Sequence, residues 1–423
     1  MSTLPSPVRR ATPHLRCGRC GSDHELAPLI FGCPRCAKGG VISVLEVEWI
    51  GQDAPTPLSA RQGKGLARYL DLMPGATSDW VSLGEGDTGL VRSRSIGRRL
   101  GFDALYFKNE TVNPTWSFKD RYVAVTINLA REFGFRRVVV SSTGNLGVST
   151  AAYCAAAGLD CLFLAAPGTA DAILAQAQLH GALVVMTTWD GRQPLFEHLA
   201  RNRGWFPLGL FLPRPVHNPF GIEGYKTFAY ETIEALGEAP AAMLFPCARG
   251  NGLYGAWKGF REARAWNWAK SLPAMVSCQP TGANSLEASL VAGAKAPLEL
   301  PPIQSVAFST METVADGRAL DAIRESGGNA LSASDDEILA AQRALAEEGL
   351  FVEASSALPV ACLPQLKASG RIDSRRPVVC VLTAAGIKWI DRLAFDRAAV
   401  VDLPPDPAAM DKLLAQRGLD RKA

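Results

Sequence analysis

The chain has 423 residues, of which 48% are hydrophobic and 20% charged. At about 150 residues per domain this length indicates two or three domains with a large core, which excludes a small binding module and a largely disordered chain. The formal net charge of +3 comes without a run of like charges. This argues against a nucleic-acid or polybasic membrane surface and favours a small-molecule partner.

The sequence also lacks the marks of a membrane or exported protein. No run of 18 uncharged apolar residues occurs, and the segment up to Arg16 carries arginines and prolines with no apolar stretch after them. We therefore expect a soluble, unexported, cytoplasmic protein. Four of the ten cysteines cluster near the N-terminus and six are scattered singly, which is unlike a secreted disulfide framework.

Residues 1–50 are the first predicted element, a zinc-ribbon-like segment. Two Cys-x-x-Cys pairs are separated by twelve residues, and four soft thiolates in this spacing suit a tetrahedral Zn²⁺. Reduced thiols in a loop and a redox dithiol pair are the alternatives. A closed four-cysteine shell leaves no position for substrate, so we expect the metal to stabilise the fold. The expected ligands are Cys17, Cys20, Cys33 and Cys36.

Residues 51–65 are expected to form a linker and residues 400–423 a tail, and from about residue 100 short apolar runs alternate with helix-length amphipathic segments. Near-continuous apolar strands separated by helices indicate buried parallel sheets, hence an α/β fold. Ligands of such folds bind at the carboxyl ends of strands, so chemistry is expected in the loops that follow them. Strands are predicted at 104–108, 137–141, 161–165, 182–187, 242–246, 274–279 and 377–383, and helices at 118–133, 147–157, 171–180 and 335–348.

The loop after the first of these strands places Lys119 in the first turn of a helix that Ser117 can cap. The positive end of the helix dipole disfavours an ammonium and lowers the pKa of a lysine, as an amine that attacks a carbonyl requires. Most first-turn lysines are solvated surface groups, so an ordinary surface lysine remains an alternative at this point.

Three further loops carry polar or glycine-rich sequence. Residues 141–147 offer hydroxyls, an amide side chain and backbone N–H groups for a carboxylate, although an ordinary capped turn explains them equally well. The amides of residues 246–255 can bind a phosphate, but the loop is neither a Walker A motif nor a GxGxxG motif. Residues 382–388 place the hydroxyl of Thr383 at the end of the last strand.

Together these loops resemble one family. The segments similar to it are NPTxSFKDR at 113–121, STGN at 142–145, LGEGDT at 83–88 and NPFxIEGYKT at 218–227. They look like the signature of fold-type II, tryptophan synthase β-like, pyridoxal-phosphate (PLP) enzymes, and specifically of threonine synthases. The resemblance covers roughly residues 80–390. It implies a large PLP-binding domain at 51–120 and 235–399, a smaller mobile domain at 121–234, and a homodimer.

The resemblance also implies roles for individual residues. Lys119 would hold PLP as a Schiff base and shuttle protons, Asn145 would bond the 3′-oxygen of the cofactor, and Thr383 would meet its pyridine nitrogen. The cofactor phosphate would lie against Arg249, Gly250, Asn251, Gly252 and Leu253, and the substrate carboxylate against Ser142, Thr143 and Gly144. The implied enzyme is a carbon–oxygen lyase acting on phosphates, which converts O-phosphohomoserine and water to threonine and phosphate in amino-acid biosynthesis.

Two departures from the family pattern bear on the substrate. Trp116 stands where the family usually has glycine, and an indole cannot share the freedom of glycine at positive φ, so we expect a different pocket volume and loop geometry. Arg249 brings a fixed charge that either strengthens phosphate binding or selects a second anionic group. A diverged paralogue, cysteate synthase-like or serine/threonine dehydratase-like, is therefore the alternative. A non-catalytic PLP-binding regulator is a further one.

Overall fold

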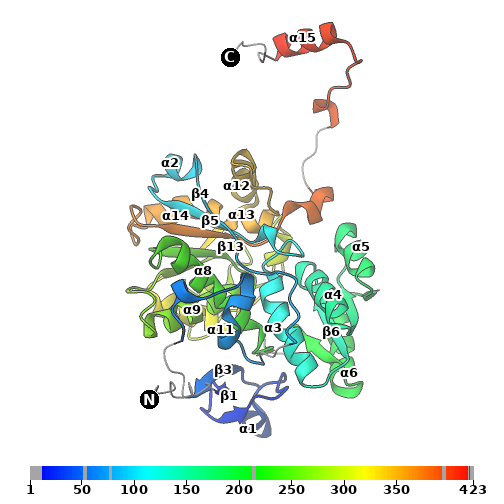
Figure 1. Ribbon diagram of the computed structural model, residues 1–423, viewed down its shortest axis with the longest axis vertical. Coiled ribbons are helices and arrows are strands. Elements are labelled where there is room, and N and C mark those ends of the chain that lie inside the picture. The colour runs from blue at the N-terminus through cyan, green and yellow to red at the C-terminus, as the bar shows by residue number, and fades with distance from the viewer. Residues whose placement is uncertain are drawn as a thin grey trace, which may run out of the picture. The chain divides into compact units, whose positions relative to one another are not determined.

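The computed structural model describes residues 12–50, 55–75, 79–211, 216–392, 397–417 and 419. The chain divides into two compact units, Met1–Lys388 and Trp389–Ala423. The second unit contains the 3₁₀ helix η6 (Arg397–Ala399) and the helix α15 (Pro407–Gln416), labelled in Figure 1. Proline at the first position of α15 and the side chain of Asp406 at its N-cap explain where it begins. The segment predicted as a plain tail therefore contains a helix.

The N-terminal cysteines lie in a small antiparallel sheet with the strand order β2-β1-β3. Leu15 and Cys17 of β1 and Leu45 and Val47 of β3 are buried, with the period of two that a strand with one covered face requires. A short helix, α1, follows Cys33 and carries Cys36. The bounds are β1 Thr12–Cys17, β2 Asp23–Glu25, α1 Pro34–Lys38 and β3 Leu45–Ile50. Residues 12–50 are called the cysteine module below.

The segment predicted as a linker is partly packed structure. Its described residues include η1 (Leu58–Ala60), in which Leu58 is buried. The following η2 (Gly65–Leu72) buries Leu66 and Tyr69 completely. Apolar side chains at these positions explain why the segment folds against the body, and the linker prediction is wrong for residues 58–65. Residues 51–54 of that prediction lie outside the described residues.

A six-stranded sheet with the order β14-β13-β12-β15-β5-β4 forms the larger layer of the fold. All neighbours are parallel except the edge strand β4, which pairs antiparallel with β5. Every residue of β15 is buried, because helices cover both faces of a parallel sheet. Each fully buried valine or leucine there contributes about 1.5–3 kcal/mol. The bounds are β4 Leu90–Arg92, β5 Leu105–Asn109, β12 Ala242–Pro246, β13 Ala274–Pro280, β14 Asn329–Ala333 and β15 Val378–Leu382.

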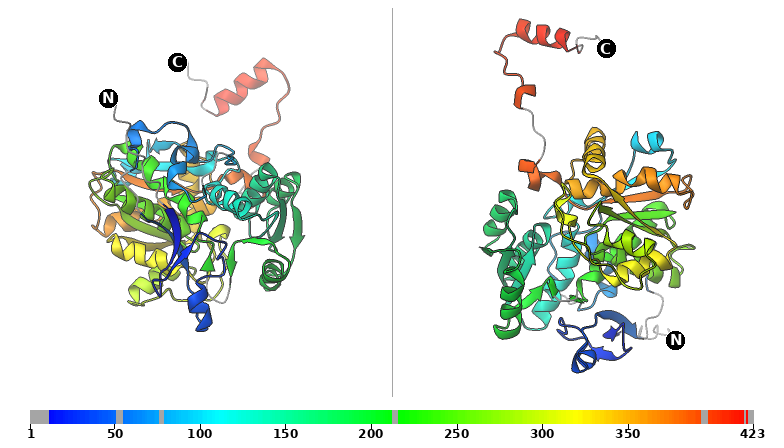
Figure 2. Two further views of the ribbon diagram at one scale, coloured as in Figure 1. Left: turned by 60° about the horizontal axis from the view of Figure 1, so that its bottom comes forward. Right: turned by 180° about the vertical axis from the view of Figure 1, so that it is seen from behind.

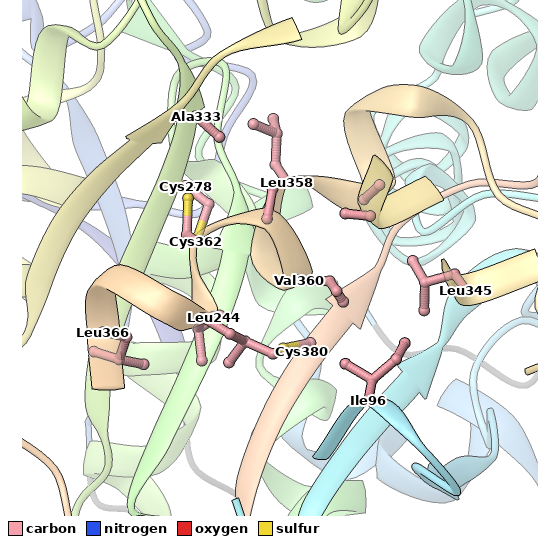
Figure 3. Packing of buried hydrophobic residues seen from close by; sticks show 14 of the residues in the cluster. Ile96, Leu244, Cys278, Ala333, Leu345, Leu358, Val360, Cys362, Leu366 and Cys380 are labelled. Atoms are coloured by element: carbon pink, nitrogen blue, oxygen red, sulfur yellow. The ribbon is translucent and has the colours of Figure 1, made fainter. Parts of the chain in front are cut away.

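The hydrophobic core of this layer lies between the sheet and the helices α13 (Ala354–Ala361) and α14 (Leu363–Ala368). Figure 3 shows Cys278, Cys362 and Cys380 among aliphatic side chains such as Leu244 and Leu358. All six scattered cysteines are buried, as expected for core thiols.

A second, four-stranded parallel sheet has the order β8-β7-β6-β9. The helices α4, α5 and α6 accompany it, and the two sheets appear as separate groups of strands in Figure 2. The bounds are β6 Arg137–Ser142, α4 Asn145–Ala157, β7 Asp160–Ala165, α5 Asp171–Leu179, β8 Leu183–Met186, α6 Arg192–Asn202 and β9 Phe206–Leu208. A two-stranded pair, β10 (Leu210–Phe211) with β11 (Val216–His217), follows.

Helix α3 (Lys119–Glu132) connects these two groups of elements. Eleven consecutive residues from Asp120 to Ala130 are buried, and the helix contacts both α4 and α7. A helix that is covered all round from its second residue onward belongs to the interior of the molecule. The remaining helices are α2 Ile96–Leu100, α7 Gly221–Tyr225, α8 Thr227–Leu236, α9 Asn251–Ala265, α10 Ser285–Val291, α11 Gly317–Glu325, α12 Asp335–Glu347, α13 Ala354–Ala361 and α14 Leu363–Ala368, with 3₁₀ turns η3 Glu110–Val112, η4 Phe308–Thr310 and η5 Gly386–Arg392.

The structure thus confirms a mixed α/β fold with parallel sheets, and each of the seven predicted strands is present to within one or two residues. The predicted domain boundaries stay a prediction. Among the described residues, no helix combines the length and the apolar character needed to cross a bilayer.

Candidate cofactor site

Lys119 is the first residue of α3, and the loop before it is fastened to the end of β15. Phe118 N–H donates to the carbonyl of Thr383 (2.8 Å), and Ala385 N–H donates to the carbonyl of Trp116 (3.0 Å). These bonds join two loops that are more than 260 residues apart in sequence. The expectation that the carboxyl ends of different strands meet here is fulfilled for Lys119 and Thr383.

The ε-amine of Lys119 is partly buried and lies 4.4 Å from the centre of the Phe118 ring. Burial lowers the pKa of Lys119 to about 8, and the charges of Glu353 and Glu312 oppose that shift. At pH 7 about a tenth of such amines are neutral, far more than of an ordinary lysine. The amine is thus suited to attack a carbonyl, and removal from water is the main cause of its lowered pKa.

The expected capping of this helix by Ser117 is wrong. The N-cap is Phe118, without a side-chain hydrogen bond, and the buried Ser117 Oγ has no hydrogen-bond partner among the described residues. The loop is held instead by Asp120, whose carboxylate accepts from Thr115 N–H (2.7 Å), Thr115 Oγ1 (2.5 Å) and Ser149 Oγ (2.6 Å). Because Ser149 belongs to α4, Asp120 ties the loop to the second sheet's first helix.

Trp116 adopts the left-handed conformation with φ of 59°. Its indole is 45% exposed. The tryptophan thus adopts a backbone conformation that favours glycine. The side chain projects a large apolar surface from the loop that precedes Lys119.

The second loop lies at the end of β6 and leads into α4. Gly144 N–H donates to Ser142 Oγ (3.0 Å), so Ser142, Thr143 and Gly144 form a tight turn before the helix. Asn145 is buried as the first residue of α4, and its Nδ2 donates to Glu353 (3.1 Å). Glu353 also acts on the charge of Lys119. The structure thus brings the loop of Asn145 to the same carboxylate as Lys119.

The third loop carries the expected phosphate-binding residues Arg249, Gly250, Asn251, Gly252 and Leu253. Gly250 caps α9 at φ 92°, where a Cβ would lie 2.4 Å from Ala319 Cβ. At Gly252 a Cβ would lie 3.0 Å from the Phe118 ring. Tyr254 N–H donates to the Gly250 carbonyl (2.9 Å), so the preceding amides are those that a helix N-terminus presents to an anion.

Arg249 pairs with Glu312 through Nη2 (2.7 Å). Its Nε and Nη1 are buried without a hydrogen-bond partner in the described part of the chain. Since Glu312 also acts on the charge of Lys119, the guanidinium lies on the same side of the molecule as the amine. Two unused donors in a fixed planar fork suit an anion.

Thr383 directly follows β15, and its side chain is buried with Oγ1 2.8 Å from Ser356 Oγ. Ser356 also accepts from Ala384 N–H (2.9 Å), which restricts how the two hydroxyls can turn. A hydroxyl pair fixed in this way can meet a ring nitrogen as donor or acceptor.

A buried ionic network next to the site has no counterpart in the sequence analysis. Arg121 is fully buried and bonds to Glu110 and Glu231, and Lys108 donates to Glu231 as well (2.6 Å). The one sequence feature that indicated a buried charge was the presence of Lys108 in an otherwise apolar strand. Its partner lies 123 positions away, and such a distance cannot be read from local pattern.

The four cysteines of the module lie together. All four Sγ atoms are within 4.8 Å of one another, with Cys17–Cys36 and Cys20–Cys33 separations of 3.8 Å. His24 Nε2 lies 3.4 Å from Cys33 Sγ. Zn–S bonds of about 2.3 Å place tetrahedral sulfurs about 3.8 Å apart, so this spacing is compatible with a metal.

The residues at the four loops fit pyridoxal phosphate. The partly buried amine suits its aldehyde, and the helix N-terminus at Gly250 suits its phosphate. The buried, unpartnered hydroxyl of Ser117 and the unused guanidinium donors of Arg249 supply polar groups that a bound molecule would satisfy.

Comparison with known proteins agrees with this fit. Residues 81–384 match the family of pyridoxal-phosphate dependent enzymes. The threonine synthase of Methanocaldococcus jannaschii is 35% identical over 382 residues, covering 88% of this chain and 92% of that protein. Threonine synthase of Methanosarcina acetivorans is 32% identical over 413 residues (94% and 96%), and that of Mycobacterium tuberculosis 36% over 350 residues (82% and 94%).

Solved structures share the fold. The processed form of threonine deaminase isoform 2 from Solanum lycopersicum has a TM-score of 0.63 at 20% identity, covering 80% of this chain and 98% of that one. Maize serine racemase has a TM-score of 0.62 at 18% identity, covering 78% and 93%.

Proposed function

Because this chain belongs to the family of pyridoxal-phosphate dependent enzymes, we propose that it is a lyase that converts O-phosphohomoserine and water to threonine and phosphate. The observation that carries the proposal is the amine of Lys119, with its pKa lowered to about 8, beside loops from both sheets. The similarity to threonine synthases over most of the chain supports the choice of reaction.

The cofactor, when bound, withdraws electrons from the substrate and stabilises negative charge on the carbons next to its amine. Lys119 binds the cofactor's aldehyde and then moves protons at Cα, Cβ and Cγ of the substrate. Asn145 donates to the 3′-oxygen, and the Thr383 hydroxyl meets the pyridine nitrogen. A hydroxyl there does not hold the ring nitrogen protonated as a carboxylate would, which favours elimination and replacement over transamination.

Two sets of backbone groups hold the anionic ends of cofactor and substrate. The amides of Gly250, Asn251, Gly252 and Leu253 bind the cofactor phosphate at the start of α9, where the orientation of the N–H groups and the helix dipole favour an anion. Ser142, Thr143 and Gly144 bind the substrate carboxylate at the start of α4. Arg249 adds its two unused donors to the phosphate side.

Product analysis tests this function. The purified holoenzyme with O-phosphohomoserine is expected to release threonine and phosphate in equal amounts. Lys119→Ala is expected to lose both the products and the cofactor's absorbance band, whereas Lys295→Ala, at an exposed position, keeps them. Absence of threonine from the wild-type reaction, with cofactor bound, would contradict the proposed reaction but leave the cofactor site intact.

A diverged specificity is the second candidate, and Trp116 is the observation that favours it. Trp116 is 45% exposed and adds a large apolar surface three residues before Lys119, where glycine would have no side chain. The cysteate synthase-like or serine/threonine dehydratase-like alternative predicts turnover of other β- or γ-activated amino acids. A panel of phosphorylated, acetylated and free hydroxy-amino acids separates these activities, and cofactor binding without any turnover would indicate a regulator.

Trp116→Gly is expected to widen the range of amino-acid substrates that the enzyme turns over. An unchanged substrate preference would count against Trp116 as a specificity residue.

We also propose that the cysteine module holds one structural Zn²⁺ through Cys17, Cys20, Cys33 and Cys36. Their mutual spacing supports a tetrahedral ion, and four thiolates leave no open coordination position for substrate. Metal analysis of protein purified without chelator is expected to give about one zinc per chain. A disulfide between two of these cysteines in the freshly purified protein would favour the redox alternative.

The homodimer and the cytoplasmic location belong to the same proposal. Sedimentation equilibrium tests the dimer, and fractionation of the source cells tests the location.

A further inference from the structure

Lys388 is a second buried amine beside the proposed cofactor site. It lies five residues after Thr383, and only 1% of it is exposed. Its Nζ donates to the carbonyl of Thr115 (2.5 Å) and to Oδ1 of Asn145 (2.6 Å). One side chain therefore joins the loop before Lys119 to the first residue of α4.

Charged groups of two helices, α3 and α13, face Lys388. Asp120 of α3 and Glu353 at the start of α13 attract its ammonium, yet burial lowers the pKa of Lys388 to about 8. Lys119, which adjoins Asp120 and also interacts with Glu353, brings a second positive charge to the same place. The two lysines thus both interact with Glu353, and Asp120 adjoins Lys119 in sequence and attracts Lys388.

The contacts of Lys388 decide which way the Asn145 amide points. An ammonium only donates, so the atom of Asn145 that faces it must be the oxygen. The NH₂ group is then turned away from Lys388, where it donates to Glu353 (3.1 Å). Without the Lys388 ammonium, nothing at this position would favour the oxygen of the Asn145 amide over its NH₂ group.

We propose that Lys388 is a positioning residue that fixes Asn145 as a hydrogen-bond donor to the cofactor's 3′-oxygen and places positive charge behind that amide. This inference rests on the proposed function, because it takes Asn145 to contact the cofactor. Like charges disfavour each other, so the ammonium of Lys388 lowers the pKa of the nitrogen that Lys119 contributes to the cofactor linkage.

A pH titration of the bound cofactor's absorbance tests the inference. In Lys388→Met the midpoint is expected to rise by about one pH unit, and the dissociation constant for pyridoxal phosphate to rise about tenfold. Lys388→Arg keeps the charge and the donors and is expected to return both quantities toward the wild-type values. Lys295→Met, at an exposed position, is the control that leaves both unchanged.

A double-mutant cycle with Asn145→Ala shows whether Lys388 acts through the amide. The double variant is expected to bind the cofactor no more weakly than Asn145→Ala alone. Fully additive losses, or a folded Lys388→Met protein with the wild-type midpoint and affinity, would overturn the inference. If circular dichroism shows Lys388→Met unfolded, Lys388→Gln replaces it. That variant keeps a donor without the charge, so the midpoint is expected to rise, and an unchanged midpoint again overturns the inference.

The two proposals fail differently. Wild-type protein that binds no cofactor, or Lys119→Ala that keeps the absorbance band, contradicts the proposed site as a whole. If the wild-type protein binds the cofactor and Lys388→Met has the same titration midpoint and cofactor affinity, only the proposed role of Lys388 is contradicted.

Discussion

Trp116 holds a backbone conformation that disfavours its side chain. Among the described residues, Asp87 and Asn267 are the other two that are not glycine and have positive φ. Asparagine and aspartate tolerate this region because their short polar side chains bond locally, whereas a left-handed conformation costs other residues about 1–2 kcal/mol. The loop is kept in place by the bond from Ala385 N–H to the Trp116 carbonyl.

Trp116→Gly is therefore expected to raise the free energy of unfolding by about 0.5–1 kcal/mol, because relief of strain exceeds the added entropy of the unfolded chain. Urea denaturation of the cofactor-free protein measures the change. Asn267→Gly is the matched control, since its φ is 61°, and its stability is expected to stay within a few tenths of a kcal/mol. Equal stabilisation by both variants would show that the tryptophan is not strained.

The lowered pKa of Lys119 predicts how cofactor capture depends on pH. The neutral amine is the nucleophile, so the rate of capture is expected to rise with pH and to level off above a pKa of about 8. Stopped-flow absorbance after mixing cofactor-free protein with pyridoxal phosphate measures this rate. A rate that keeps rising to pH 10 would mean that the amine is as accessible to water as an ordinary lysine.

Single residues could be predicted from sequence where the signal is local. Lys119 was expected in the first turn of a helix and begins α3. The cap by Ser117 failed because the loop turns toward the end of β15, and Thr383 instead holds the backbone. The contact of Lys388 with Asn145 spans 243 positions, so only the fold brings the two side chains together.

At the scale of elements, α3, α8 and β5 are joined by charge rather than by apolar packing alone. Arg121 of α3 bonds to Glu231 of α8 and to Glu110 beyond β5, and Lys108 of β5 shares Glu231. Thr227 and Thr88 accept the other guanidinium donors. The positive charges hold the pKa of Glu231 far below its usual range. A network so fully paired holds the start of α3 in one position.

Glu231→Gln is expected to lower the free energy of unfolding by about 3–5 kcal/mol, because Arg121 would keep only Glu110 and the buried Lys108 would have no carboxylate partner. Glu234→Gln on the same helix is the control. Glu234 forms an ion pair with Arg68, and about one-third of the Glu234 side chain is exposed. Loss of this ion pair is expected to lower the free energy of unfolding by less than about 1 kcal/mol. Denaturant unfolding monitored by tryptophan fluorescence compares them, and similar losses would refute the buried network as a source of stability.

The elements themselves were predictable in proportion to their length and apolar character. The seven expected strands are continuous apolar runs, and all are present. The strands β4 and β9 have three residues each, too few to show a period. The glycine-containing start of α7 also hides its helix, because glycine has low helix propensity although the segment is buried by tertiary packing.

At the scale of the molecule, the cysteine module contacts the helices α9, beside the six-stranded sheet, and α6, beside the four-stranded sheet. Tyr254 OH of α9 donates to Glu46 (2.5 Å), and Lys258 of α9 donates to the carbonyl of Val47 (2.5 Å). On the other side, the guanidinium of Arg201 in α6 lies 4.0 Å from the centre of the Phe31 ring. Phe31 also packs against the core of the four-stranded sheet.

Removal of the proposed zinc is therefore expected to affect more than the module. Cys20→Ser should lose the metal, lower the melting temperature and weaken cofactor binding, since α9 begins at the proposed phosphate loop. Arg19→Ser, at the exposed neighbouring position, is the control. Calorimetry and cofactor titration measure the two effects. An unchanged cofactor affinity in metal-free protein would show that the module and the site are independent.

The contacts of the module also limit how the chain can be divided or recombined. Lys258 of α9 donates to the carbonyl of Val47 and pairs with Glu223 of α7. Deletion of the first fifty residues would therefore remove one hydrogen-bond acceptor of the buried Lys258 ammonium. Phe31 would likewise leave its place beside Arg201 vacant. The module is consequently not an interchangeable part: a relative without it must cover these helices in another way, and grafting it onto such a relative would require new side chains on α6 and α9.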